Sequence, residues 1–389
     1  MPLPITNPRR CWIRLSTLLF LLPPALFSAE IAALRLSSPL DYQVFQRSTG
    51  AQGKILFRGA LPETARATDA LEVRFARAGE SPPWTRLARS TDAQSEWRAE
   101  MDAPAGGWHR VEVRISRQGS ALAAGVVEHV GVGEVFVVLG QSNAANHGEE
   151  KLKTATGLVA ALSDQGWRLS EDPQPGASGG GGSFIPAFGD EMARRFHVPI
   201  GVVAGAVGAT SVREWLPRGS RFPNPPTLTG HVTHRAEGDW ESKGDIHEST
   251  IARLKPLGRR GFRAVLWHQG ESDANQRDTS RTLPGDDYQR LFLQLARRVR
   301  SELGWEFPWF VAQASYHTPD DPGSADIRSA QAALWTSGIA LPGPDTDALT
   351  GDFRDSGGKG VHFSGKGLRE HGRLWAEKVA PWLEAQLKQ

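Results

Sequence analysis

A serine and a histidine in this sequence stand in surroundings that could support nucleophilic catalysis. Ser142 lies in Gly140-Gln-Ser-Asn143, directly after the apolar run 134–139 and behind a glycine that permits a tight turn. His362 lies in Gly357-Gly-Lys-Gly-Val-His-Phe-Ser364, immediately before a segment with helical periodicity. A serine nucleophile needs a base, donors for the charge that develops on the substrate oxygen, and an acid that orients the base. A lone serine at such a turn more often caps a helix, so the remaining groups decide between the two interpretations.

The segment that follows the apolar run 200–204 offers a donor for that oxygen. Gly208 precedes Ser211 and Glu214, whose spacing predicts a capping box and therefore the start of a helix. A backbone N–H at such a turn can face a developing negative charge, although a plain strand-to-helix turn explains the glycine equally well. Trp215 could cover the apolar face of a sugar, while packing is the ordinary role of a tryptophan.

A string of polar residues, Trp267-His-Gln-Gly-Glu-Ser-Asp273, follows a third apolar run at 264–267. A buried strand seldom ends in so many polar groups unless each of them has a partner. The Gln269 amide can donate to an oxyanion, and the Glu271 carboxylate can accept the imidazole N–H of His362. An ordinary salt bridge is the alternative role for Glu271.

The place of His362 before a predicted helix bears on its basicity. The partial positive charge at a helix N-terminus disfavours a protonated ring, so we expect a lowered pKa and a neutral imidazole that can accept a proton. The final helix is expected to begin at Ser364 as its N-cap and to direct Leu368, Trp375 and Val379 inward.

Strands and helices alternate through the part of the chain that carries these residues. Continuous apolar runs, typical of parallel strands buried on both faces, occur within 134–139 and at 200–204, 264–267 and 309–312. One face of a predicted helix over 288–303 contains Tyr288, Leu291, Phe292, Leu295 and Val299. The alternation predicts an α/β domain over 132–389, with a parallel sheet in a three-layer α/β/α arrangement. The motifs follow the strands, so we expect them to meet at the carboxyl edge of the sheet, where ligands of such domains bind.

Residues 33–131 have a different pattern. Apolar and polar residues alternate in Leu71-Glu-Val-Arg-Phe-Ala-Arg77 and in Val111-Glu-Val-Arg-Ile-Ser-Arg117, and clusters of turn residues separate such segments. This spacing predicts a small N-terminal β-sandwich, and no catalytic motif occurs in it.

Residues 1–29 are typical of an export signal. Three arginines at positions 9, 10 and 14 accompany a largely apolar stretch over 15–27, which is too short to span a membrane and is interrupted by Pro23 and Pro24. The pattern predicts cleavage near Ala29 and export to the periplasm or the extracellular space, with an uncleaved anchor as the alternative. The single cysteine, Cys11, lies inside this segment, so the mature chain is expected to have no thiol.

Charge argues against two classes of partner. The 389 residues include 45 basic and 43 acidic side chains, which leaves a net charge of +2. A balance so close to neutral is not typical of proteins that bind nucleic acid or an anionic membrane surface, and apart from the export signal no membrane partner is expected.

The three strings described above resemble the sialate O-acetylesterase-like branch of the SGNH hydrolases, the group that includes carbohydrate esterase family six. The resemblance covers residues 131–389, and the Gln-Gly-Glu string at 269–271 is its most specific part. It implies an SGNH-type fold with Ser142 as nucleophile and His362 as base. The implied oxyanion hole consists of the N–H groups of Ser142 and Gly208 and the Gln269 amide. The expected substrate contacts are Gln141, Asn143 and Trp215.

The sequence departs from this family at one position. The wider family often has an aspartate three residues before the histidine, where this chain has Lys359. A lysine cannot accept the imidazole N–H, and its charge disfavours the imidazolium. The orienting acid is therefore expected to be Glu271, which some relatives use, or else Asp355, seven residues before His362.

These observations predict an esterase that removes acetyl or other short acyl groups from sialate-type or xylan-type glycans through an acyl-enzyme, without metal or other cofactor. A carbohydrate-binding protein of the same fold that has lost catalysis is the main alternative, because of Lys359. A metallohydrolase built on His231, His234 and His247 is a weaker one, since the first two lie in a loop without a glutamate at helical spacing. A lipase is less compatible with the polar, Gly/Pro-rich loops.

Overall fold

The computed structural model describes residue 1 and residues 31–76, 82–91 and 96–388. The predicted export signal and its cleavage site near Ala29 lie outside the described residues, apart from Met1. Residues Ala32–Gln389 form one compact unit. In the described part of the chain, every helix is too short or too polar to cross a bilayer.

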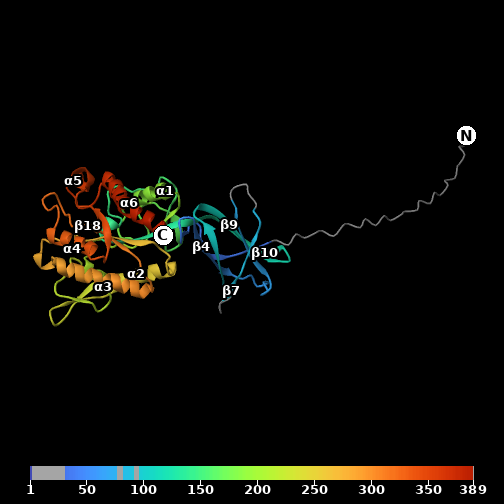
Figure 1. The fold of residues 1–389 in the computed structure, drawn as a ribbon, viewed down its shortest axis with the longest axis horizontal. Coiled ribbons are helices and arrows are strands. Elements are labelled where there is room, and N and C mark those ends of the chain that lie inside the picture. The colour runs from blue at the N-terminus through green and yellow to red at the C-terminus, as the bar shows by residue number, and fades with distance from the viewer. Residues whose placement is uncertain (2–30, 77–81, 92–95, 389) are drawn as a thin grey trace. The chain divides into compact units, whose positions relative to one another are not determined.

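A large, mostly parallel sheet forms the centre of the fold in its C-terminal two thirds (Figure 1). Its strand order is β12-β11-β13-β10-β17-β18-β19. All neighbours on this path pair in parallel except β11 and β12. The bounds are β10 Ser120–Gly140, β11 Val159–Ser163, β12 Gly166–Leu169, β13 Ile200–Ala204, β17 Ala264–His268, β18 Trp309–Gln313 and β19 Leu341–Asp345. The four strands predicted from apolar runs are thereby confirmed, because each of these runs is buried in the sheet.

Helices cover both faces of this sheet, and successive residues of β10 show how. Val135, Val137 and Leu139 enter a core that contains Tyr288, Leu291 and other residues of α3. Phe136 and Val138 point the other way, into a core shared with α1 and α6. The helices are α1 Ile185–Phe196, α2 Asp245–Leu254, α3 Gly285–Leu303, α4 Ala325–Thr336, α5 Asp355–Gly358 and α6 Gly365–Leu387. The predicted apolar face of 288–303 is buried as expected.

The predicted helix starts are also confirmed. Ser364 is the N-cap of α6, and its hydroxyl accepts the N–H of Gly367. Ser211 and Glu214 form the capping box, although the helix that follows is a single 3-10 turn. The 3-10 helices are η1 Ser142–Ala144, η2 Val212–Trp215, η3 Lys255–Leu257, η4 Thr279–Arg281 and η5 Gly351–Phe353. A separate small sheet consists of β14 Arg221–Phe222, β15 Val232–His234 and β16 Trp240–Ser242.

The N-terminal third is all-β. One sheet contains β2, β4, β8 and β7, while β3, β9, β5 and β6 extend from the amino-terminal part of β10. Both sets contribute to one apolar core, in which alternate residues of β5 and β9 are buried, as the alternation predicted; β4 and β8 show the same pattern. The bounds are β1 Ala32–Ala33, β2 Leu36–Ser38, β3 Val44–Gln46, β4 Gln52–Ala60, β5 Ala70–Ala76, β6 Thr85–Leu87, β7 Ser90–Thr91, β8 Glu96–Pro104 and β9 Gly106–Arg117.

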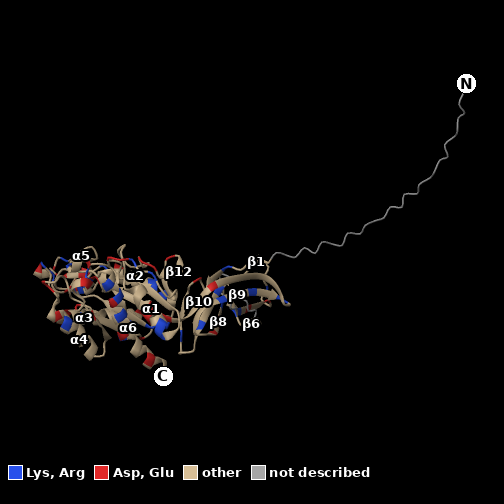
Figure 2. Cartoon of the chain, turned by 90° about the horizontal axis from the view of Figure 1, so that it is seen from above, with Lys and Arg blue, Asp and Glu red and all other residues tan. Residues whose placement is uncertain are grey.

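The two parts share a strand and a buried ion cluster. β10 continues without a break across the predicted boundary at 131/132. Just beyond it, the fully buried Glu134 accepts from Arg47 Nε at 2.7 Å and from Arg263 Nε at 2.6 Å. Elsewhere in the described chain, basic and acidic residues are interspersed over the elements (Figure 2).

Candidate active site

The predicted motifs meet at one cavity of about 630 Å³. Ser142 follows β10, Gly208 follows β13 and Glu271 follows β17, so all three lie beyond the carboxyl ends of parallel strands. Together with His362 they line this cavity, along with Gln141. The sheet therefore brings together segments that are more than 200 residues apart, as the position of the motifs predicted.

Ser142 is held by a tight turn at the end of β10. Gly140 has a φ of +131°, and a Cβ at this position would lie 2.0 Å from the carbonyl oxygen of His268. Only glycine fits here, and the chain can then turn into η1 immediately. Among the described residues, the Ser142 N–H has no hydrogen-bond acceptor, and the Ser142 hydroxyl makes no hydrogen bond with His362. Such catalytic contacts are often loose until a substrate binds.

His362 lies on a short hairpin whose other side carries Asp355. Arg354 and Phe363 form a β-bridge, and the N–H of Asp355 donates to the carbonyl oxygen of His362 at 2.9 Å. Asp355 Oδ2 lies 3.7 Å from His362 Nδ1, which is longer than a hydrogen bond. The hairpin thus explains how an acid seven residues away reaches the ring while the exposed Lys359 sits at the turn.

The pKa of His362 is below its usual value, but for a different main reason from the one predicted. Burial of the ring is the largest cause. The Asp355 and Glu271 carboxylates raise this pKa in part, and the Arg354 guanidinium lowers it further. The ring is consequently neutral near pH 7 and able to accept a proton.

Arg354 stabilises the hairpin through hydrogen bonds to backbone oxygens, and it was not identified from the sequence. Its guanidinium is buried and donates to the carbonyl oxygens of Leu349, Thr346 and Val361. It also stacks on the Tyr316 ring, at 3.9 Å from the centroid. A buried arginine that bonds only backbone oxygens holds the loop in place without occupying either carboxylate.

Glu271 is linked to the His362 loop through Asn143. Asn143 Nδ2 donates to Glu271 Oε1 at 2.9 Å and to the carbonyl oxygen of Val361 at 3.1 Å. The other oxygen, Oε2, is buried and has no hydrogen-bond partner among the described residues. Asn143 itself does not line the cavity, so the structure gives it a bracing position in place of the expected substrate contact.

Two other predicted site residues are not brought to the cavity. The Gln269 amide nitrogen donates to Asp273 Oδ2 at 2.6 Å and to the carbonyl oxygen of Thr210 at 3.1 Å, so its donors are occupied. Trp215 is 1% exposed and packs edge-on against Trp267 in the core. Gln269 thus braces the neighbouring loop, and Trp215 has the packing role that is ordinary for a tryptophan.

The cavity also contains residues that the sequence did not single out, including His147, Ser178 and His317. The His147 ring stacks on His362 with 5.3 Å between centroids. Gly208 N–H, the predicted oxyanion donor, is bonded to Ser178 Oγ at 2.7 Å. The glycine-rich segment that contains Ser178 thus contributes a polar group to the cavity wall. Isolated serines and histidines in loops carry no spacing signal from which this position could have been predicted.

The three histidines considered for a metal site are separately engaged. His231 Nδ1 lies 2.6 Å from Asp245, His247 Nε2 lies 3.2 Å from Glu302, and His234 packs against Trp240. Within the described ranges no group of three or more His, Cys, Asp or Glu side chains is arranged to hold a metal ion.

Comparison with known families and structures gives a consistent result. Residues 132–380 match the family described as carbohydrate esterase, sialic acid-specific acetylesterase. No curated protein matches the sequence. A carbohydrate acetylesterase from Xanthomonas citri has a similar structure, with a TM-score of 0.50 and 18% identity over 87% of this chain and 73% of the other.

Two further structures are less similar. A protein from Arabidopsis thaliana has a TM-score of 0.43 and 18% identity, covering 64% of this chain and 98% of that one. A carbohydrate esterase family 2 enzyme with a carbohydrate-binding domain, from Corynascus thermopiles (Myceliophthora fergusii), has a TM-score of 0.38 and 10% identity, covering 90% and 100%. At these identities only the fold of the Xanthomonas enzyme is informative.

Proposed function

We propose a serine-dependent deacetylation of carbohydrates, on the premise that this chain belongs to the family of carbohydrate esterases described as sialic acid-specific acetylesterases. The observation that carries the proposal is that Ser142 and His362 line the same cavity. A neutral, largely buried imidazole that lines the same cavity as a serine at the end of a parallel strand offers the pair that acyl transfer requires.

The reaction proceeds in two steps. His362 takes the proton from Ser142 Oγ, which attacks the acetyl carbonyl carbon, and the carbonyl oxygen becomes an oxyanion near the Ser142 N–H. The C–O bond to the sugar then breaks, and His362 returns the proton to the departing hydroxyl. In the second step His362 takes a proton from a water molecule, which attacks the acyl carbon; the bond from that carbon to Ser142 Oγ breaks, His362 returns the proton to Oγ, and acetate leaves.

We assign the orienting acid to Asp355. Its carboxylate approaches Nδ1, the nitrogen that must carry a proton if Nε2 is to act on Ser142. Asp355 Oδ1 is buried without a partner, so a small rotation is free to shorten the 3.7 Å separation when substrate binds. Glu271 contributes its negative charge and, through Asn143, the position of the loop.

The sequence expectations about context remain part of the proposal. We infer a three-layer arrangement for 132–389 and a distinct β-sandwich over 33–131; the helix-covered faces of β10 and the shared core of the N-terminal strands support these inferences. The substrate is an acetylated glycan of sialate or xylan type, and the chain is exported by residues 1–29.

Replacement of the nucleophile tests the proposal. We expect Ser142→Ala to abolish hydrolysis of p-nitrophenyl acetate and labelling by a fluorophosphonate probe, with an unchanged circular dichroism spectrum. Ser337→Ala, on an exposed helix end, serves as the matched control. Full turnover by Ser142→Ala would refute the assignment.

A carbohydrate-binding protein without catalysis is the second candidate. The observation that favours it is that the Asp355 carboxylate makes no hydrogen bond with the His362 ring, since Oδ2 lies 3.7 Å from Nδ1. The same probe separates the two candidates: an acetylated glycan that binds to a protein the probe does not label would support binding alone.

A further inference from the structure

We propose that Ser178 is a further catalytic residue. Its hydroxyl donates directly to the oxyanion, and the hydrogen bond that it accepts from the Gly208 N–H makes it a stronger donor. This inference rests on the serine mechanism proposed above and adds a donor that neither the sequence motifs nor the family description identifies. The chain of hydrogen bonds runs from Gly208 N–H to Ser178 Oγ and then to the substrate oxygen.

The position of the hydroxyl supports this role. Ser178 Oγ accepts the Gly208 N–H at 2.7 Å and lies 3.3 Å from His147 Nε2, and all three residues line the cavity with Ser142. A serine hydroxyl has a single proton to donate. Because Oγ already accepts from Gly208, that proton is free to point at His147 or into the cavity, and an accepted hydrogen bond makes it a stronger donor.

Ser178 is firmly positioned, which an oxyanion donor requires. Its N–H donates to the carbonyl oxygen of Ala206 at 2.9 Å, and its own carbonyl oxygen accepts from Asn146 N–H at 2.9 Å. The packing around it is close: a Cβ on Gly208 would lie 2.6 Å from His147 Nε2, and a Cβ on Gly179 would lie 2.3 Å from the Asn146 oxygen. Preorganised donors of this kind stabilise developing charge without reorganisation.

Two of the expected oxyanion donors, the Gln269 amide and the Gly208 N–H, already donate to other groups of the protein. The Gln269 amide is committed to Asp273 and Thr210. A substrate oxygen could reach Gly208 N–H only by displacing the Oγ of Ser178, whose backbone is held in place by two hydrogen bonds. The hydroxyl therefore takes the place of the second donor beside the Ser142 N–H.

His147 provides a resting acceptor for the hydroxyl proton. Burial and the neighbouring His362 lower the pKa of His147, so its ring is neutral near pH 7 and Nε2 can accept. When the oxyanion forms, the stronger acceptor draws the proton from His147 to the substrate. This movement is a rotation of the hydroxyl and requires no change of the backbone.

The test compares an oxygen ester with its sulfur analogue. Sulfur is a much weaker hydrogen-bond acceptor than oxygen, so a variant that lacks an oxyanion donor should lose activity on the ester far more than on the thionoester. We expect Ser178→Ala to lower kcat/KM for p-nitrophenyl acetate about 100-fold and that for p-nitrophenyl thionoacetate less than about tenfold. Both esters are measured on one preparation of each variant. A fraction of unfolded protein lowers both values by the same factor and leaves their ratio unchanged.

Ser183→Ala is the matched control, because it removes a buried hydroxyl of the same loop that bonds Asp172 and lies outside the cavity. It should lower the melting temperature and leave the ratio of the two esters unchanged. Equal losses on both esters in Ser178→Ala would show a structural role and overturn the inference, and so would full or increased activity on the acetate. If the wild-type protein hydrolyses neither ester, the proposed function fails and this inference falls with it.

Discussion

At the scale of single residues, His362 determines whether the proposed chemistry can run. Its ring is partly buried, faces two carboxylates and lies near the Arg354 guanidinium, and the net effect is a pKa below the usual value of about 6.5. A base must be neutral to accept a proton. Activity is therefore lost only when the pH falls through this lowered pKa.

The first prediction concerns the acidic limb of the pH profile. We expect kcat/KM of the wild-type protein to rise with pH and reach half of its plateau below pH 6.5, since the free-enzyme pKa of the base governs this limb. Asp355 raises the His362 pKa, so Asp355→Asn should move the midpoint to lower pH and reduce the plateau on the order of 10²-fold. Initial rates between pH 4 and 8 provide the measurement.

Glu271→Gln separates the two candidate acids. It removes a charge that also raises the His362 pKa, so its midpoint should move in the same direction. Its plateau should fall less than that of Asp355→Asn if Asp355 orients the ring. A normal plateau in Asp355→Asn together with a collapse in Glu271→Gln would assign the orienting role to Glu271.

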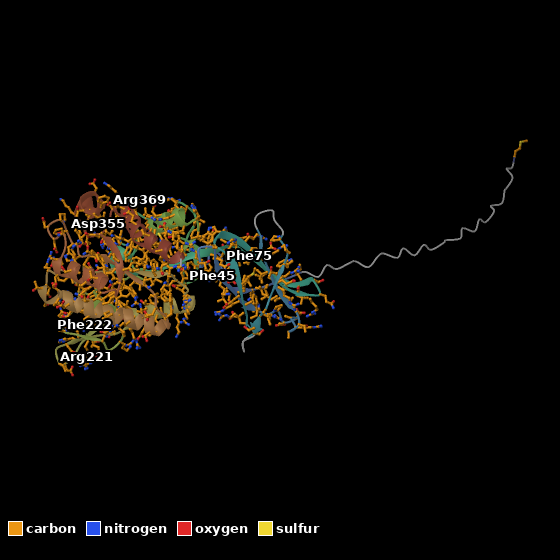
Figure 3. All side chains as sticks on the ribbon, viewed as in Figure 1. Phe45, Phe75, Arg221, Phe222, Asp355 and Arg369 are labelled. Carbon is orange, nitrogen blue, oxygen red and sulfur yellow. The ribbon has the colours of Figure 1, made fainter. Side chains whose placement is uncertain are left out.

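At the scale of elements, the hairpin between η5 and α6 places the Asp355 carboxylate 3.7 Å from the His362 ring, where the proposed acid and base would act together. Figure 3 labels Asp355 near Arg369 of α6, on the part of the fold where this hairpin lies. The N–H of Gly360 donates to the carbonyl oxygen of Asp355 at 3.0 Å and closes the turn. Space is so limited that a Cβ on Gly360 would lie 1.6 Å from Asp355 Oδ1.

Gly360→Ala should therefore displace the Asp355 carboxylate. We expect kcat for p-nitrophenyl acetate to fall on the order of 10²-fold with little change in KM, because the oriented base is lost and the cavity remains. Gly357→Ala is the control: Gly357 has a φ of +68° but no atom within 4 Å of an added Cβ, so it introduces backbone strain without touching Asp355. Equal kinetic losses in both variants would mean that backbone strain in the hairpin, and not displacement of the Asp355 carboxylate, lowers the activity.

At the scale of the whole molecule, a buried ion cluster joins the N-terminal strands to the central sheet. Glu134 is 0% exposed and Arg47 is 3% exposed, and Gln46 Nε2 also donates to Glu134 at 2.8 Å. Glu134 begins the sheet portion of β10, whereas Ser142 follows its other end. The buried cluster and the proposed nucleophile thus lie at opposite ends of this segment of the strand.

Glu134→Ala should lower the free energy of unfolding by about 3 kcal/mol, because it leaves the Arg47 charge buried without an acid. Denaturant titration followed by tryptophan fluorescence measures the change, and kcat/KM of the folded protein should stay near the wild-type value. Glu248→Ala removes an exposed pair with Arg218 and should cost less than about 1 kcal/mol. A loss of similar size in both variants would show that the buried cluster has no special role.

The amino-acid sequence by itself determined four strands of the central sheet, the helix starts at Ser364 and Ser211, and the edge of the sheet where the motifs meet. These features follow from local properties: apolar runs such as 134–139 require burial on both faces, and Ser364 can cap α6 whatever surrounds it. The order of strands and helices then directs Ser142 and Glu271 to one edge.

Only the tertiary structure decided which polar groups partner one another. Asp355 reaches His362 through a hairpin, Gln269 is committed to Asp273, and Ser178 bonds Gly208 across two loops. Whether a hydrogen bond forms between two loops depends on differences of a few tenths of an ångström in the donor–acceptor distance. It also depends on backbone conformations that residue types do not encode. The place of the candidate site could therefore be predicted from residue types and spacing, but the hydrogen-bond partners of the polar groups around it could not.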